Sequence, residues 1–484
     1  MSIRRISGLE VLIWIILVII VLLALSPYVI GYKAKSDYAY LINQISKNFQ
    51  VDLQVSTYNQ GFFSSQATLG LTLPNSSETI YLNEEIVHGP IYLGLLNQNK
   101  SPLIAAVING KLDMGASHLP EFNKILSGTN PLLYQHLINF SGDVDSQLYV
   151  PAIMTVIQDE EESVHLESSG AIYTQFLSSA SGNVKGEMSI PLIKIHKTNF
   201  NMNLEESVVS FSGKKGNNKL MIGDTVISVG SLNIDSAEEQ FAVKKLIVHS
   251  VTSENSELIN AGTRVTAREI LASNQKFGPI VLNFGLNGFN ANSIHEIQKI
   301  NKALDNQLKQ GLSEEEVDAI MQAKLMAVIP DLIKQAEVNI NPLSINSELG
   351  RLEADMEFKM LGIDAKASTD PLMLLSAIDF QLNMSIDEPL MRKVIFWNLD
   401  HSTEIKPSLI NAKVKSENSY ELMSRKVDDN LQAMMEVNWL VKDEGVYLSK
   451  ISMQQGELLI NGVSADALQQ IMSSVTNDAE VAIP

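Results

Sequence analysis

The first thirty residues of the chain constrain its fold most, because they determine where the rest of the chain lies relative to a membrane. No charged side chain occurs from Val11 to Tyr32, and Val11–Leu25 consists almost entirely of Val, Ile, Leu and Trp. An α-helix needs about 20 apolar residues to cross the hydrocarbon core of a bilayer. The sequence therefore predicts a transmembrane segment over residues 11–32, and residues 33–484 contain no second stretch of this kind.

The flanks of this segment favour an anchor that is retained after export. A cleavable signal peptide ends in small residues, and the nearest candidate, Ala24-Leu25-Ser26, is followed at once by Pro27, which resists cleavage. Two arginines and the terminal amine precede the segment, and two lysines follow it. This slight asymmetry favours a cytoplasmic N-terminus, residues 1–10, and an exported body.

Composition supports export and excludes several kinds of chemistry. The chain has no cysteine, which excludes disulfides, cysteine–zinc sites, iron–sulfur clusters and thiol nucleophiles. Its 36 Lys and Arg residues face 55 Asp and Glu residues, which gives a formal net charge of −19. Such a surface repels phosphate backbones, so nucleic acid is not expected as a partner.

The body alternates apolar and polar residues over many stretches, as half-buried strands do. Asn and Gly separate these stretches, as in Gly213–Asn218, where a hairpin turn is predicted. Successive long strands joined by turns favour a large, mostly antiparallel sheet. The clearest alternation occurs in Val51–Val55, Ala67–Leu73, Val184–Ile190, Val208–Ser212, Phe241–Val251, Val338–Ile345 and Arg351–Met360.

Helices are predicted at fewer places, and two of them have a recognisable start. Ser293 and Ser313 are each followed three residues later by Glu, which is the pattern of a capping box. The two predicted helices, Ser293–Gln310 and Ser313–Gln335, would form a helical hairpin. The other predicted helices are Asp37–Phe49, Asp370–Phe380, Glu421–Glu436 and Asp466–Val475.

Together these patterns predict an α+β protein with one N-terminal transmembrane helix and a large, mostly antiparallel β-sheet body. The predicted order is a stalk helix over residues 33–50, an N-terminal β-rich region over 51–290 and a helical hairpin over 291–337. A C-terminal β-rich region with helices follows over 338–484. Large sheets leave edges that a second chain can cover, so a homo-oligomer is an open alternative.

The sequence contains no recognisable catalytic, cofactor-binding or metal-binding motif. No two histidines stand within four residues of each other, so no helical metal pair is present. Neither a nucleophile elbow nor a phosphate-binding loop occurs. Asp143 and Asp145 alternate on a predicted strand, which is more often a solvated face than an acid–base pair. The eight histidines are His88, His118, His136, His165, His196, His249, His295 and His401.

Several short motifs are spread along the body: Gly61-Phe62-Phe63-Ser64-Ser65, His88-Gly89-Pro90, Gly278-Pro279 and Gly456-x-Leu-x-Ile-Asn461-Gly462. Together they resemble the motifs of the YdgA-like family of bacterial inner-membrane proteins, a family without an assigned function. Two departures from the family pattern occur: Phe62 stands where the family has Trp, and no Arg precedes Gly61. The resemblance implies a single-span inner-membrane protein with a β-rich periplasmic body, and it implies no reaction.

These motif residues have a simpler structural interpretation. Gly61 followed by two aromatic residues suits a turn that drives Phe62 and Phe63 into a core. His88-Gly89-Pro90 suits a rigid turn whose histidine is a hydrogen-bond partner, with Glu84 or Glu85 within reach. The Asn461-Gly462 pair suits a turn after a strand.

The sequence leaves three hypotheses for function. The first is a non-enzymatic, binding or scaffolding protein of the cell envelope, anchored in the bacterial inner membrane by its N-terminal helix, with a lipid or an envelope protein as partner. The second is a periplasmic carrier that holds a lipid or another hydrophobic molecule on an apolar sheet face, analogous to bridge-like proteins of the AsmA type. The third is an enzyme with a dispersed site. What covers the apolar face of the sheet separates the first two.

Overall fold

The computed structural model describes two compact units. Unit 1 comprises Met1–Lys214 and Leu232–Ala237, and unit 2 comprises Lys215–Ser231 and Glu238–Pro484. The described residues are 26, 27, 32, 35, 38, 39, 42, 43, 46, 52–72, 79–113, 115, 132–158, 163–237, 240–272, 275–309, 313–361, 377–401, 416–454 and 456–464.

Unit 1 is built from antiparallel strands and a short 3-10 helix, η1 (Leu93–Gln98). Strand β12 (Met221–Ser236) contributes residues to both units. The other strands are β1 (Asp52–Gln60), β2 (Ser64–Thr72), β3 (Thr79–His88), β4 (Ala106–Leu112), β5 (Leu133–Ile138), β6 (Val144–Val150), β7 (Ile153–Gln158), β8 (Ser163–Ser168), β9 (Ala171–Leu177), β10 (Val184–Lys197) and β11 (Phe200–Lys215).

The strands of unit 1 pair in the order β1-β2-β3-β4-β5-β6-β9-β10-β11, each antiparallel to its neighbour. Strands β7 and β8 extend the β6–β9 hairpin, and β8 pairs with the second half of β10. The hairpin breaks where Pro151 faces Gly170. Gly170 has a φ of +90°, and a Cβ there would lie 2.4 Å from the carbonyl oxygen of Val150, so this crossing requires glycine.

The described residues between 26 and 46 are helical, and two of them pack against the sheet of unit 1. Tyr38 and Ile42 are buried in a core with Ala67, Leu69 and Ile86 from β2 and β3. Burial of this face fixes the helix on the sheet, because apolar area removed from water stabilises by roughly 25 cal/mol per Å².

Unit 2 contains a second antiparallel arrangement, in the pairing order β13, β14, β16, β17, β18, β19, β21, β22, β23. Strand β15 continues beside β13 and β16 where β14 ends, and β20 pairs with the start of β21. The strands are β13 (Gln240–Asn255), β14 (Leu258–Ala267), β15 (Glu269–Ala272), β16 (Gln275–Asn290), β17 (Glu337–Ser347), β18 (Gly350–Met360), β19 (Ile378–Asp387), β20 (Val441–Asp443), β21 (Val446–Gln454), β22 (Glu457–Ile460) and β23 (Val463–Ser464).

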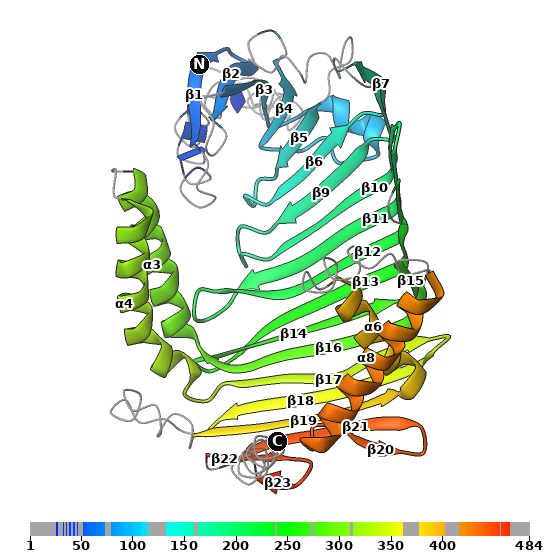
Figure 1. Cartoon of the computed structure of the whole chain (residues 1–484). Helices are drawn as coiled ribbons and strands as arrows, with labels where there is room; N and C mark the ends of the chain where they lie inside the picture. Colours follow the sequence, from blue (N-terminus) through cyan, green and yellow to red (C-terminus); the bar gives the residue numbers. More distant parts are fainter. Residues whose placement is uncertain are drawn as a thin grey trace, which may run out of the picture. The chain divides into compact units, whose positions relative to one another are not determined.

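Two groups of helices lie at opposite ends of these strands (Figure 1). Helices α3 (Ala291–Lys309) and α4 (Glu314–Ile333) connect β16 to β17. Helices α6 (Glu388–His401) and α8 (Ser416–Glu436) lie between β19 and β20 in the chain. Ser313 caps α4 with the predicted capping box, in which its side chain accepts from the backbone N–H of Glu316.

The sheet-rich, mostly antiparallel α+β architecture predicted from the alternation is confirmed. Helix α6 is absent from the prediction, and the predicted helix Asp370–Phe380 is wrong at its end, because β19 begins at Ile378. The predicted helix Asp466–Val475 lies outside the described residues, as does nearly all of the predicted anchor over residues 11–32. In the described part of the chain, no helix is long and apolar enough to span a membrane.

Candidate functional site

One face of the sheet in unit 2 is apolar from β16 to β21. Directly paired residues of antiparallel strands point to the same face, so the register identifies the face residue by residue. A single polar residue, Ser449, interrupts the rows of apolar pairs. This apolar face consists of Ile280, Leu282, Phe284, Leu286, Val338, Ile340, Leu343, Ile345, Leu352, Ala354, Met356, Phe358, Phe380, Leu382, Met384, Ile386, Tyr447, Ile451 and Met453.

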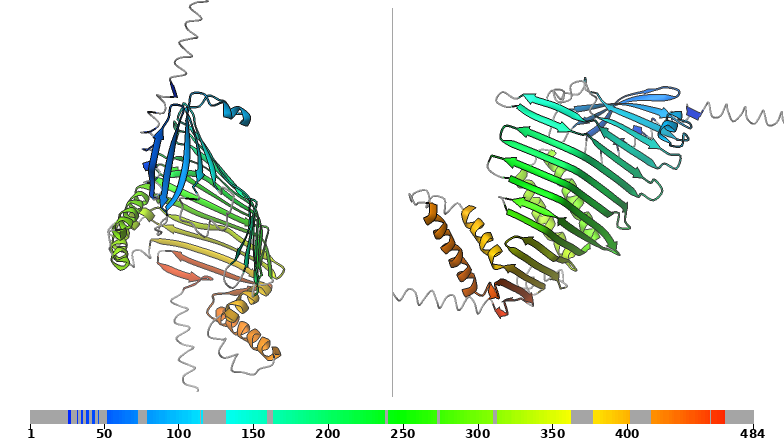
Figure 2. Two further views of the ribbon diagram at one scale, coloured as in Figure 1. Left: turned by 90° about the horizontal axis from the view of Figure 1, so that it is seen from above. Right: turned by 90° about the vertical axis from the view of Figure 1, so that its right-hand side faces the viewer.

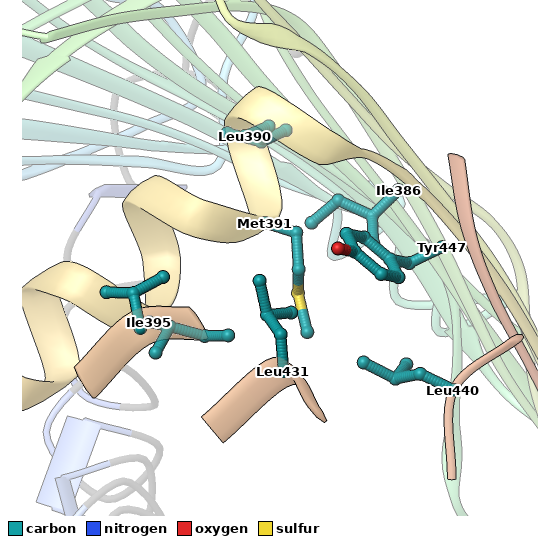
Figure 3. Packing of buried hydrophobic residues seen from close by; sticks show 8 residues of the cluster. Ile386, Leu390, Met391, Ile395, Leu431, Leu440 and Tyr447 are labelled. Atoms are coloured by element: carbon teal, nitrogen blue, oxygen red, sulfur yellow. The ribbon is translucent and has the colours of Figure 1, made fainter. Parts of the chain in front are cut away.

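Among the described residues, α6 and α8 pack on one end of the apolar face, and α3 and α4 lie at the other end of the strands (Figure 1). At one end Ile386 and Tyr447 pack beneath α6 and α8, and both are 2% exposed (Figure 3). At the other end α3 and α4 contact β16. The remaining side chains of the face are only half-buried. The middle of the face is therefore an apolar surface between two groups of helices.

The opposite face of the same strands is mostly polar, with Val281, Val446 and Leu448 as its apolar residues. The residues that alternate with the apolar ones on β18 are Glu353, Asp355, Glu357 and Lys359. On β19 the corresponding residues include Asn383, whose amide donates to Asp355 at 2.8 Å. Because this polar face is suited to water, the apolar face on the other side is the one that a core or a ligand would cover.

Two of the family motifs meet in unit 1. Ser65 Oγ lies 2.9 Å from His88 Nε2, and His88 Nδ1 lies 3.3 Å from the carbonyl oxygen of Phe62. A carbonyl only accepts, so Nδ1 carries the proton and Nε2 accepts from the Ser65 hydroxyl. Ser65 is 1% exposed and His88 is 2% exposed. The pair is closed to solvent, and its hydrogen bonds join the β1–β2 turn to the end of β3.

The aromatic residues of the same motif are on the surface. Phe62 and Phe63 are 42% and 65% exposed, and their rings contact each other edge to face with centroids 4.8 Å apart. The prediction that they enter a core is therefore wrong. The turn itself has the predicted form, but Gly61 and Ser64 close it so tightly that both rings point outward: a Cβ on Gly61 would lie 2.4 Å from the Ser64 carbonyl oxygen.

The buried carboxyl group of Glu84 lies four residues before His88 on strand β3. Glu84 is 6% exposed, and its two carboxylate oxygens accept hydrogen bonds from the hydroxyl groups of Tyr38 and Tyr134. Burial raises the pKa of Glu84, and the two phenol donors oppose that rise. Burial, followed by the charge of Glu84, raises the pKa of Tyr38 and of Tyr134. No motif in the sequence indicates this cluster, because its three residues come from separate segments of the chain.

Tyr134 reaches Glu84 across a glycine. Glu84 pairs with Gly110, and Gly110 pairs with Tyr134 on the next strand. A Cβ on Gly110 would lie 1.9 Å from the Tyr134 ring, so the ring occupies the space above the glycine. Only glycine at position 110 lets the phenol cross β4 to the carboxylate on β3.

We expect Gly110→Ala to lower the free energy of unfolding of unit 1 by about 2 kcal/mol, because the added methyl displaces the Tyr134 ring. Gly262→Ala on β14 is the control, since a Cβ there meets nothing within 4 Å. Hydrogen exchange of peptides from β3 to β5 in the full-length protein measures the effect. Equal protection in the two variants would contradict this explanation of Gly110.

The remaining motif residues form a bulge within β16 and turns elsewhere, and the pairing of β16 with β17 shifts register between Phe277 and Ile280. Gly278 has a φ of +139°, and a Cβ there would lie 2.2 Å from the carbonyl oxygen of Arg268. Asn461 and Gly462 have φ of 48° and 82° between β22 and β23. The Asn461 side chain accepts from the N–H of Lys450 and donates to the carbonyl oxygen of Asn438, each at 2.7 Å. Gly89 and Pro90 follow β3, and the Gly89 N–H donates to Ala105.

The other candidate groups are dispersed. His136 lies beside Tyr134 and within 2.8 Å of Ser146 Oγ, and burial lowers its pKa. Asp143 lies in a turn, where the N–H of Ser179 donates to it, while Asp145 lines a groove of about 430 Å³. His118 lies outside the described residues. In the part of the chain that is described, no group of three or more His, Asp or Glu residues could hold a metal ion.

These features define a class: a sheet-rich α+β protein whose second unit carries one apolar and one polar face. The chain belongs to a family of bacterial proteins of unknown function, DUF945, whose model matches residues 8–465. The predicted kinship with a bacterial family of unassigned function is thus confirmed at that level. No curated protein and no solved structure matches the chain.

Proposed function

We propose that this protein binds an extended hydrophobic molecule, such as a lipid acyl chain, along the apolar face of unit 2. The single observation that carries the proposal is the continuity of this face across β16, β17, β18, β19 and β21. A ligand lying across these strands would remove half-buried Leu, Ile, Met and Phe side chains from water, which is favourable at roughly 25 cal/mol per Å².

The dimensions of the face suit an acyl chain. Neighbouring strands lie about 4.8 Å apart, so five strands span about 19 Å from the first to the last. One leaflet of a bilayer has a hydrocarbon thickness of roughly 15 Å, which is the length that its acyl chains occupy. An extended chain therefore fits across the face, between α3–α4 at one end of the strands and α6–α8 at the other.

The binding function is non-enzymatic and belongs to the cell envelope. The apolar segment over residues 11–32 anchors the chain in the inner membrane, and the body lies in the periplasm. The acidic composition keeps such a body soluble. Met356, Met384 and Met453 contribute flexible side chains to the face, which suits a ligand whose exact shape varies.

The proposal is tested by mass spectrometry of the full-length protein. The protein is extracted from the membrane in an amphipathic polymer, and bulk lipid is then removed by exchange. We expect stoichiometric amounts of an acyl-chain lipid to remain bound after exchange. Protein that is free of lipid, and that does not bind a dansyl-labelled fatty acid when titrated with it, would overturn the carrier function.

A protein partner is the second candidate, because the same apolar face could be covered by an amphipathic segment of an envelope protein. This is the scaffolding function. Fatty-acid binding and cross-linking separate the two candidates. A lipid-binding protein binds the labelled fatty acid, which competes with a lipid for the apolar face. A scaffold does not bind the fatty acid and forms a stable cross-linked protein complex through residues of β17 and β18.

A further inference from the structure

A second apolar surface lies in unit 1, at one end of its strands. It is formed by large side chains that are between 42% and 66% exposed. They come from three connections that are separate in the sequence: the β1–β2 turn, the segment between β3 and β4, and the β5–β6 turn. We name as the apolar rim the residues Phe62, Phe63, Leu93, Leu96, Leu103 and Phe140.

The strand register brings these connections to one edge of the unit. His88 at the end of β3 pairs with Ala106, and Ala106 pairs with Ile138 at the end of β5. The N–H of His88 donates to the carbonyl oxygen of Phe63 at 2.8 Å, which ties the first turn to the second connection. The buried Ser65–His88 hydrogen bond strengthens the same junction. These pairings and hydrogen bonds fix the connections beside one another, so the apolar rim is a single surface.

The N-terminal helical residues approach the same edge. Tyr38 contacts the ring of Tyr58 near the end of β1, and Lys35 Nζ lies 5.8 Å from the centroid of the same ring. These described residues therefore lie beside the end of β1 that leads to the apolar rim. Figure 2 shows η1 at the end of unit 1 where the described residues nearest the N-terminus lie.

The distances along the two elements agree. Eleven residues separate Pro27 from Tyr38, which is about 16 Å along a helix. Four residues separate Tyr58 from Phe62, which is about 13 Å along a strand. Pro27 thus lies at about the level of the apolar rim, and Val11–Leu25, the most apolar part of the anchor predicted over residues 11–32, ends two residues before it.

We propose that the apolar rim inserts into the interfacial layer of the membrane that the N-terminal anchor enters. Unit 1 would then be held by the anchor and by the rim together, with this edge against the lipid. The chemistry fits a bilayer interface: the loop over residues 90–105 contains Tyr92 and four leucines but only one charged side chain, Lys100. Lysine is attracted to anionic headgroups, and aromatic rings favour the interface.

Membrane contact by the apolar rim does not depend on a ligand of unit 2. Because the chain has no cysteine, single cysteines introduced by mutation can be labelled specifically. Leu93→Cys and Phe63→Cys place one thiol each on the rim of the full-length protein, for labelling with an environment-sensitive fluorophore. Met154→Cys is the matched control. Met154 is 83% exposed on β7, beyond the end of β6 that lies away from the rim.

The labelled proteins are reconstituted in vesicles of phosphatidylethanolamine and phosphatidylglycerol. We expect doxyl-labelled lipid to quench the two rim probes at least threefold more than the Met154 probe, and aqueous iodide to show the reverse order. Rim probes that iodide quenches as strongly as the control would overturn the proposal. Rim probes shielded from both quenchers would also overturn it, because they would indicate a protein partner or a second copy of the chain.

Discussion

Glu84→Ala is expected to lower the free energy of unfolding of unit 1 by about 3 kcal/mol. The substitution leaves the hydroxyl groups of Tyr38 and Tyr134 without their acceptor in a buried site, and an orphaned buried donor costs roughly 1–3 kcal/mol. Hydrogen exchange of β2–β5 peptides in the full-length protein measures the loss. The helical residues around Tyr38 should lose protection in the same experiment, because Glu84 joins them to the sheet.

Glu85→Ala is the matched control, since Glu85 is the next residue on the strand and is exposed. Its removal should change the free energy of unfolding by less than about 0.5 kcal/mol. A Glu84→Gln variant keeps one acceptor and one donor for the two phenols and should retain most of the stability. Equal losses for Glu84→Ala and Glu85→Ala would show that the cluster contributes nothing specific.

The pH dependence of this cluster has a definite sign. Burial raises the pKa of Glu84 above its ordinary value of 4.5, so the folded state holds the proton more tightly than the unfolded state. Its contribution to stability is full below pH 4.5 and is lost as the pH rises through the raised pKa. Relative to Glu84→Gln, the natural protein should lose stability over that window. Urea unfolding of both proteins across the acidic and neutral range checks the difference.

The sequence predicts the kind of fold better than the buried cluster. Alternation in Val184–Ile190 and Arg351–Met360 reports one buried and one wetter face, which is a local property of each strand. The contacts of Glu84 depend on register between distant strands: its partners lie 46 and 50 residues away in the chain. Nothing local distinguishes Glu84 from the exposed Glu85, so the buried carboxyl could not be found from the pattern.

Helix α6 is not predicted from the sequence, and Phe62 and Phe63 are wrongly predicted to enter a core. These two errors have different reasons. Helix α6 begins at Glu388 with a proline in its first turn, both of which suit a helix start. That signal is present but short, and it follows a strand without a break. Phe62 and Phe63 suggest a core by their hydrophobicity alone. Their exposure follows from a tight turn and from the position of the turn at an edge, which only the paired strands define.

Ile451→Glu is expected to weaken binding of a labelled fatty acid at least tenfold, while Ser452→Glu leaves it unchanged. Both residues are half-buried neighbours on β21, but they point to opposite faces of the sheet. Ile451 pairs with Leu382 in the apolar face, and Ser452 pairs with Gln381 in the polar face. A carboxylate beneath an acyl chain must either lose its bound water or displace the ligand, and both outcomes weaken binding. A tenfold loss of affinity corresponds to only about 1.4 kcal/mol of binding free energy, so the expected effect is a lower bound.

Fluorescence titration of the full-length variants with a dansyl-labelled fatty acid measures the affinities, and ligand-dependent stabilisation provides a second readout. A ligand at a concentration of 100 times its dissociation constant stabilises the folded state by about 2.7 kcal/mol. That stabilisation should be present in the natural protein and in Ser452→Glu, and it should shrink in Ile451→Glu. If both glutamates reduce binding equally, the ligand does not lie on the apolar face. If neither does, the site is elsewhere on the molecule, and the continuity of the face from β16 to β21 has another cause.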